Sequence, residues 1–296
     1  MVRVAHISDV HVSVRPLGWR FRDCFNKRAT TWMNLRLSRA KAFRRADVIL
    51  QALETDRQER GIEHVIFSGD ATALGYPSEI ARAAALLGVG RGPGLAVPGN
   101  HDYLIRFAAT SGEFERRFGP WQVGQRIDQH IYPFAQKIGD VWLVAVNSAR
   151  GTRLFWDATG AVGPEQAHRL RTLLSQLTPG PRILVTHYPL RNANGHIEHS
   201  THRLRDHAQA IASATRAGIS LWLHGHIHRG FVLLPTPHIP FPVICAGSCT
   251  QTNRWMYNEY EISGDTLTML RRRFDPISNA FQDAERETIP LLIPPR

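Results

Sequence analysis

The feature that most constrains this chain is a series of Asp, Asn and His residues that directly follow short apolar runs. Such runs are typical of buried strands, so the polar residues fall in the loops at the strand ends. In chain order the segments are Asp9-Val10-His11 after Val2–Ile7, Gly69-Asp70 after His64–Ser68, Gly99-Asn100-His101-Asp102 after Gly94–Val97, His187 after Arg182–Thr186, and Gly225-His226-Ile227-His228 after Ile219–Leu223. The pattern predicts a sheet whose strands come from distant parts of the chain.

Helical patterns separate many of these strands, which indicates an α/β protein. We predict helices over Ser38–Arg60, Pro77–Leu87 and Pro164–Leu177, and further strands over Trp142–Asn147, Pro242–Ala246, Tyr257–Ile262 and Thr266–Arg272. We find no internal repeat and no obvious linker. We therefore expect one domain over residues 1–275, with a basic, aromatic-rich insertion and the first helix at 15–45, and a C-terminal tail over 276–296.

The polar segments have the chemistry of a metal centre. In sheets of this type, sites form beyond the carboxyl ends of the strands, so five loops can converge there. Carboxylates can bridge two cations, and imidazole nitrogens suit manganese, iron or zinc. No cysteine follows these strands, which argues against a thiolate zinc site. Two ions roughly 3.5–4 Å apart can clamp a phosphate and activate a water molecule.

The order Asp-x-His, Gly-Asp, Gly-Asn-His-Asp, His, Gly-His-x-His resembles the calcineurin-like metallophosphoesterase superfamily, in its bacterial form. The resemblance implies a four-layer α-β-β-α sandwich, with two mixed sheets flanked by helices. It also implies two divalent transition-metal ions. One departure is Ala73, because many members read Gly-Asp-x-x-Asp. We expect this change to affect the substrate subclass and to leave the metal site intact.

The resemblance also implies a role for each polar residue. The first metal ion would lie among Asp9, His11, Asp70 and His228, and the second among Asp70, Asn100, His187 and His226. His101 would protonate the leaving oxygen, and Asp102 would orient the imidazole of His101 and raise its basicity.

These roles predict hydrolysis of a phosphodiester, a phosphomonoester or a pyrophosphate by attack of metal-bound hydroxide. The chain resembles UDP-2,3-diacylglucosamine hydrolases, which favours a lipid-linked substrate. It also resembles class III cyclic-nucleotide phosphodiesterases, so a soluble enzyme that hydrolyses cyclic AMP is the alternative. A nuclease and a non-catalytic scaffold are less favoured, since every expected ligand is present.

The positive charge of the chain is concentrated near its start. The formal net charge is +11, and the segment Arg15–Arg45 holds ten basic residues against one acid, Asp23. Aromatic residues such as Trp19, Phe21 and Phe25 lie among these cations. This mixture suits an anionic lipid surface or a lid over a lipid-linked substrate. Nucleic-acid binding and an ordinary packed excursion are the other interpretations.

Two further expectations concern location and the remaining histidines. A strand that begins at the second residue leaves no room for a leader, so we expect a cytoplasmic protein, or one peripheral to the inner face of the cell membrane. The three cysteines are expected to be small buried residues in a reducing compartment. His196, His199 and His202 are expected in a solvated loop, His224 as a packing or supporting residue, and Arg150 at the surface.

Overall fold

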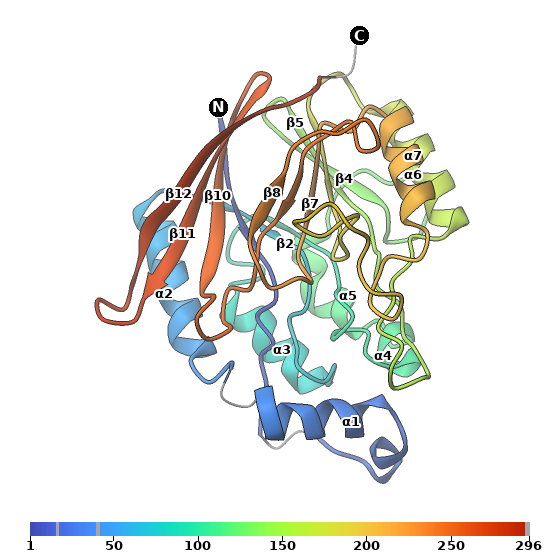
Figure 1. Cartoon of the computed structure of the whole chain (residues 1–296), viewed down its shortest axis with the longest axis vertical. Helices are drawn as coiled ribbons and strands as arrows, with labels where there is room; N and C mark the ends of the chain where they lie inside the picture. The colour runs from blue at the N-terminus through green and yellow to red at the C-terminus, as the bar shows by residue number, and fades with distance from the viewer. Residues whose placement is uncertain (16–17, 40–41, 294–296) are drawn as a thin grey trace.

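Two six-stranded sheets pack face to face in the computed structural model, which describes residues 1–15, 18–39 and 42–293 (Figure 1). The first sheet has the order β12-β11-β10-β1-β2-β3, and the second has the order β4-β5-β6-β7-β9-β8. The strands are β1 (Val2–Ile7), β2 (His64–Phe67), β3 (Gly94–Ala96), β4 (Phe134–Ile138), β5 (Val141–Ala145), β6 (Arg182–Val185), β7 (Leu221–His224), β8 (Phe231–Leu233), β9 (Val243–Cys245), β10 (Met256–Ser263), β11 (Thr266–Asp275) and β12 (Ala280–Pro290). Both sheets are mixed: the parallel strands β1, β2 and β3 form one side of the first sheet, and the parallel strands β5, β6, β7 and β9 form the centre of the second.

Helices cover the outer face of each sheet. The helical elements are η1 (Phe21–Phe25), α1 (Lys27–Asn34), the π-helix η2 (Leu35–Arg39), α2 (Ala46–Glu59), α3 (Pro77–Leu86), α4 (Arg106–Thr110), α5 (Glu113–Phe118), η3 (Gly119–Trp121), α6 (Pro164–Gln176) and α7 (His207–Arg216). Buried residues of α2, α3 and α5 form one cluster with the first sheet, and those of α6 and α7 form another with the second. The predicted four-layer α-β-β-α sandwich is therefore confirmed.

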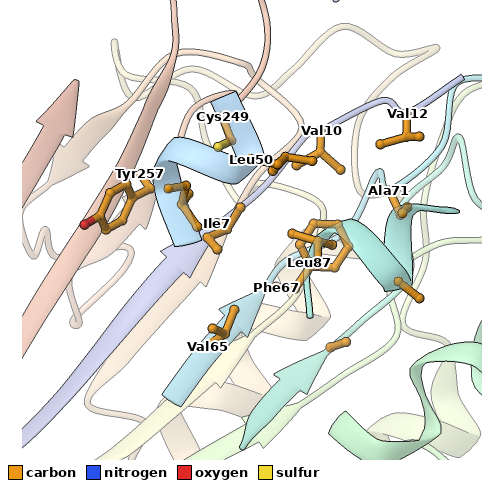
Figure 2. Close-up of a cluster of buried hydrophobic side chains, with 14 of the residues drawn as sticks. Ile7, Val10, Val12, Leu50, Val65, Phe67, Ala71, Leu87, Cys249 and Tyr257 are labelled. Carbon is orange, nitrogen blue, oxygen red and sulfur yellow. The ribbon is translucent and has the colours of Figure 1, made fainter. Parts of the chain in front are cut away.

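A separate apolar core joins the two sheets. Val4 and Ile66 of the first sheet pack with Leu143 and Val185 of the second, and all four are buried. On the outer side of the first sheet, Figure 2 shows Leu50 of α2 among side chains that include Ile7, Val65 and Phe67. Strands β1 and β2 thus present one face to the helices and the other to the second sheet, which explains their nearly continuous apolar runs in the sequence.

The first predicted helix is wrong at its start. We expected Ser38–Arg60, but α2 begins at Ala46, and residues 42–45 form a turn. Residues 40–41 of the prediction lie outside the described part of the chain. Ala42, the first residue of the apolar spacing that suggested a helix, lies in this turn, whereas Ala46, Ile49 and Leu53 of the same spacing are buried on α2. Residues 38–39 of the predicted helix belong instead to η2, which follows α1 without a break.

The predicted C-terminal tail is also wrong, because β12 occupies most of residues 276–296. β12 pairs antiparallel with β11 at the edge of the first sheet. Most of its side chains are exposed, and only Phe281 and Ile289 are buried within the strand. A strand with so few buried positions lacks the alternating apolar pattern by which strands are found. Leu267 pairs with Ile289 across this edge and is buried as well.

Two of the three cysteines lie in the interior of the protein. Cys245 and Cys249 are buried free thiols as expected, whereas Cys24 is exposed on η1. No helix in the described part of the chain has both the length and the apolar character needed to span a membrane.

Candidate dinuclear metal centre

The predicted ligands meet beyond the carboxyl ends of the central parallel strands. Five of them have positive backbone φ angles, a conformation that is uncommon for residues other than glycine: Asp9 at 54°, His11 at 44°, Asp70 at 58°, His226 at 70° and His228 at 58°. Such a conformation costs on the order of 1–3 kcal/mol per residue, and it is found mostly at functional sites, where the surrounding structure enforces it. The loops after β1, β2 and β7 therefore hold their side chains in a common, strained geometry.

The first group contains two carboxylates and two imidazoles. Atoms of Asp9, His11, Asp70 and His228 that could bind a metal all lie within 4.8 Å of one another. His228 Nε2 lies 3.2 Å from Asp9 Oδ1 and 3.1 Å from His11 Nε2. His11 Nε2 also lies 3.6 Å from Asp70 Oδ2. Except for half-buried His228, these residues are buried, so the group forms a closed corner of the site.

The second group lies on the other side of Asp70. His187 Nε2 is 3.1 Å from Asn100 Oδ1 and 3.3 Å from His226 Nδ1, and His226 Nδ1 is 2.9 Å from Asn100 Oδ1. The link to the first group is Asp70 Oδ2, which lies 3.4 Å from His187 Nε2 and 3.6 Å from His11 Nε2. One carboxylate oxygen therefore faces both groups, as a bridging ligand must.

The geometry fits two divalent ions. Ligand atoms about 2.0–2.2 Å from one ion lie roughly 3–3.5 Å from each other, which matches most of the separations above. Asp9 Oδ1 is buried, and no residue in the described part of the chain donates a hydrogen bond to it. A bound cation would satisfy this oxygen, and without one its burial would be costly. The donor set of carboxylate, amide and imidazole groups suits several transition metals equally well.

Hydrogen bonds at the opposite ring nitrogens fix the orientation of three imidazoles. His187 Nδ1 donates to the Ser68 carbonyl at 2.8 Å, and His226 Nε2 donates to the His202 carbonyl at 3.1 Å. His228 Nδ1 contacts Gln251 Oε1. In the neutral form of each ring, this bond places the single proton on the nitrogen that faces away from the site, so the nitrogen that faces the site carries a lone pair. The rings are thus prepared to bind metal.

Charges in the site depend strongly on one another. Burial favours the neutral form of Asp70, yet the neighbouring His187 and His101 hold the pKa of this carboxyl well below its usual range. Burial likewise opposes a charged His187, but the Asp70 carboxylate outweighs burial and raises the pKa of His187 to about 9. The pKa of Asp9 is also well below its usual range, since His228 and His11 outweigh burial. Both carboxyl groups are therefore ionised near neutral pH and available to cations.

His101 lies beside His11 of the first group. Its ring contacts that of His11 edge-on, with 4.7 Å between centroids. Its Nδ1 donates to the Ala73 carbonyl at 2.8 Å, and the residue lines the cavity described below. The main chain of Ala73 therefore orients the imidazole at the position where many relatives carry an aspartate.

Asp102 is fully buried between two loops of the site. Its Oδ2 accepts hydrogen bonds from the Gly99 and Ala71 amides, at 2.8 and 3.2 Å. Its Oδ1 accepts from the Thr72 amide at 3.0 Å and from the Thr72 hydroxyl at 3.1 Å. These bonds tie the loop that carries Asp70 to the loop that carries Asn100 and His101. Asp102 therefore clamps the two loops together, and its action on the His101 imidazole stays a prediction.

Two glycines permit the close approach of the loops. A Cβ atom on Gly99 would overlap Asp70 Oδ1 and lie 2.7 Å from Asp70 Cγ. A Cβ atom on Gly225 would overlap Ser8 and lie 2.5 Å from Asp9 Oδ2. The glycines of the Gly-Asn-His-Asp and Gly-His-x-His segments are thus required by packing around the ligands.

A cavity of about 710 Å³ opens over the metal ligands and His101. Its walls include residues that we did not predict, among them Lys27 and Leu35 of the N-terminal insertion and Phe155 and Trp156 of a neighbouring loop. His202 also lines the cavity, whereas His196 and His199 are exposed and do not. Sequence patterns could not identify these residues, because none of them follows a strand. His224 is buried beside Phe231 and has a packing role.

Comparisons with known proteins agree with the geometry. The family model for calcineurin-like phosphoesterases matches residues 2–230. No curated protein matches the sequence significantly. Among solved structures, a dimetal phosphatase from Danio rerio superposes with a TM-score of 0.65 at 16% identity and covers 98% of each chain. A purple acid phosphatase from yellow lupin gives 0.60 at 14% identity, over 98% of this chain and 53% of that one.

A third similar structure, GAP50 of Plasmodium, gives a TM-score of 0.55 at 9% identity and covers 98% of this chain and 89% of that chain. At these low identities the solved structures establish the fold alone. The family model covers more than three-quarters of the sequence, including every predicted ligand from Asp9 to His228. The chain therefore belongs to the calcineurin-like phosphoesterase family of metal-dependent phosphoester hydrolases.

Proposed function

We propose that the chain hydrolyses a phosphate ester or anhydride of a lipid-linked substrate, with two divalent ions held by the two groups of ligands that share Asp70. The observation that carries the hydrolytic part is the position of Asp70 Oδ2, which lies within 3.6 Å of an imidazole of each group. When bound, two such ions supply Lewis-acid stabilisation of phosphoryl oxygens and a water nucleophile at neutral pH.

The protein side chains then have three tasks. Asp9, His11, Asp70 and His228 would hold one ion, and Asp70, Asn100, His187 and His226 would hold the other. His101 lines the cavity and would donate a proton from Nε2 to the leaving oxygen, which is general-acid catalysis. The Ala73 carbonyl keeps the His101 ring in this orientation. Asp102 positions the loops and does not contact the substrate.

The lipid part of the proposal rests on the N-terminal arm, which we define as residues 18–39. Phe21, Phe25 and Leu37 of this arm are 82%, 77% and 82% exposed. Figure 1 shows α1 at the end of the molecule towards which β1 runs. Since Lys27 and Leu35 of the arm line the cavity, the arm lies beside the metal ligands. Large exposed apolar side chains beside a catalytic cavity are typical of an interaction surface.

The charge of the arm favours an anionic membrane over other partners. Arg20, Arg22 and Arg36 are exposed, while the acid of the arm, Asp23, is buried against Arg28. Each basic residue near an anionic lipid surface contributes roughly 1 kcal/mol. Exposed rings among cations match the interface between headgroups and acyl chains. The arm would therefore bring the cavity to a substrate that resides in the membrane.

Activity assays separate the hydrolytic proposal from its alternatives. We expect the protein with added Mn²⁺ to hydrolyse bis(4-nitrophenyl) phosphate, and to hydrolyse UDP-2,3-diacylglucosamine faster than cyclic AMP at equal concentration. A preference for cyclic AMP would support the soluble phosphodiesterase instead. No turnover of any phosphate ester would contradict the enzymatic function.

Vesicle binding tests the role of the arm. The double variant Phe21→Ser, Phe25→Ser should bind vesicles of phosphatidylglycerol and phosphatidylethanolamine more weakly than the wild type. Ile277→Ser is the matched control, because Ile277 is 92% exposed in the turn between β11 and β12, outside the arm. Equal loss of binding in both variants, or binding of the wild type to neutral vesicles alone, would refute the membrane surface.

A further inference from the structure

Lys27 is a buried cation at the first position of α1. Only 6% of its surface is exposed, and its ammonium group donates to the Thr152 hydroxyl at 3.1 Å and to the Asp157 carbonyl at 2.7 Å. Both acceptors are neutral. Within the described ranges, no carboxylate oxygen lies within 4.0 Å of this nitrogen. Because a buried charge is costly unless an opposite charge accompanies it, Lys27 lacks a partner that its position requires.

The carboxylate nearest in sequence to these acceptors has other partners. Asp157 Oδ2 accepts from Arg150 at 2.8 Å, and Asp157 Oδ1 accepts from the amide and hydroxyl of Thr159, at 3.0 and 2.6 Å. Arg150 thus pairs with the Asp157 carboxylate, whereas Lys27 contacts only the main-chain carbonyl of Asp157. Burial lowers the pKa of Lys27 to about 8, although Asp157 and Asp70 oppose this shift. The amine therefore stays mostly charged at neutral pH.

The neighbouring residue on the same helix, Arg28, is a buried cation whose charge is neutralised by a carboxylate. Arg28 is 4% exposed, and its guanidinium lies 3.1 Å from Asp23 Oδ1. It also donates to the carbonyls of Leu74 and Gly75, at 3.1 and 2.7 Å, and packs over the Tyr76 ring. Arg28 thus accounts for the attachment of α1 to the body of the protein. Attachment of α1 therefore does not explain why Lys27 is also buried, with only neutral acceptors for its charge.

The cavity supplies that explanation, because Lys27 lines it together with Asp70, Asn100 and His101. An ammonium group has three donors, and protein acceptors occupy two of them. The third remains for a ligand. Phe155, Trp156 and Ala158 line the same cavity, and they belong to the loop that holds the Lys27 amine.

We infer that Lys27 binds an anionic oxygen of a second phosphate adjacent to the scissile one, so that the substrate is a diphosphate diester. This inference rests on the proposed function and deepens it. In that function, the scissile phosphate would lie beside the two metal ions and His101. Lys27 is a further buried cation in the same cavity, and it would match the negative charge of a second phosphate. Because Lys27 is part of α1, the N-terminal arm would take part directly in binding the second phosphate of the substrate.

The test compares substrates that carry one phosphate or two. For wild type and Lys27→Gln we would measure KM and kcat with Mn²⁺ for 4-nitrophenyl phosphate, bis(4-nitrophenyl) phosphate and UDP-glucose, a soluble diphosphate diester. A charged hydrogen bond is worth roughly a 10–100-fold change in binding. We expect KM for UDP-glucose to rise by about this factor, and by at least ten times more than KM for either aryl ester. Lys27→Arg should recover part of the selectivity.

A structural role of Lys27 would give a different result. Thr152→Val removes one acceptor of Lys27 but keeps the ammonium group, so it should preserve the wild-type ratio of the three KM values. If Thr152→Val changed the ratio as much as Lys27→Gln, loop distortion would explain the effect and the inference would fail. Equal loss for aryl esters and UDP-glucose would also overturn it, because Lys27 would then contact the scissile phosphate.

Binding to the metal-free protein separates this inference from the proposed function. Isothermal titration of UDP-glucose into metal-free wild type should show binding that Lys27→Gln weakens at least tenfold, whether or not the loaded protein is active. If the protein hydrolysed aryl esters but did not bind UDP-glucose, the diphosphate specificity would be wrong while the phosphoesterase function would stand. If no ester were hydrolysed but Lys27→Gln still weakened the binding of UDP-glucose, the phosphoesterase function would be wrong while the diphosphate specificity would stand.

Discussion

Replacement of Asp102 by asparagine distinguishes a catalytic role of this residue from a structural one. An asparagine keeps one acceptor oxygen and replaces the other by an amide nitrogen. If the oxygen keeps the bonds from Gly99 and Ala71, the new NH₂ group faces the Thr72 amide and the Thr72 hydroxyl. The hydroxyl can turn and accept, since it already lies 3.2 Å from the His101 carbonyl, to which it can donate. The Thr72 amide then loses its acceptor.

The magnitude follows from this single loss. A buried amide without an acceptor costs roughly 1–3 kcal/mol, so Asp102→Asn should lower the free energy of unfolding by about that amount. Asp102→Ala leaves three amides without acceptors and should cost roughly three times as much. Because the Ala73 carbonyl orients His101, Asp102→Asn should retain its metal content and lose less than about tenfold in kcat, a smaller loss than the roughly 10²–10⁴-fold effect of general-acid catalysis.

Urea unfolding, metal analysis and turnover of bis(4-nitrophenyl) phosphate measure these quantities on the same preparations. A kcat reduced by more than a hundredfold in Asp102→Asn, with unchanged stability and metal content, would show that Asp102 acts on the His101 imidazole directly. That outcome would refute the structural role and restore the role that the sequence motif implied.

Three further predictions concern single residues. His101→Ala should keep its metals but lose on the order of 10²–10⁴-fold in kcat for an alkyl phosphodiester, whose leaving group needs a proton; unchanged turnover would exclude His101 as the donor. Gly99→Ala should lower metal affinity, because its Cβ would displace Asp70, and calorimetric titration with Mn²⁺ measures the loss; wild-type affinity would contradict the close packing. Burial lowers the pKa of His64 to about 4, so the unfolded chain binds a proton below pH 6.5 that the folded chain does not. Stability should therefore fall by up to about 3 kcal/mol as the pH drops from 6.5 to 4, and His64→Gln should reduce this slope in urea unfolding; an unchanged slope would assign it to other groups.

The ligands could be predicted from the sequence because two simple rules place them. Buried parallel strands appear as apolar runs, and the residues that follow such strands meet at one edge of the sheet. Asp9, Asp70, Asn100 and His187 follow strands of both sheets, and the structure brings them together. The segment order then identified the family.

Other features depend on contacts that no local pattern records. The partner of His101 is a main-chain carbonyl, which every residue type carries, so Ala73 could not be recognised as its orienting group. Lys27 reaches the cavity only because α1 folds against the loop that carries Thr152 and Asp157, over a hundred positions away. β12 was missed because pairing with β11 stabilises it, with little burial of its own side chains.

The number of bound metal ions tests the bridging position of Asp70 most directly. Inductively coupled plasma mass spectrometry of active protein should find two transition-metal ions per chain. Asn100→Ala should lower this number towards one, since Asn100 faces one group alone, whereas Asp70→Ala should lower it towards zero, since its oxygen faces both groups. Two ions retained in folded Asp70→Ala, or active wild type with no bound metal, would contradict the shared centre.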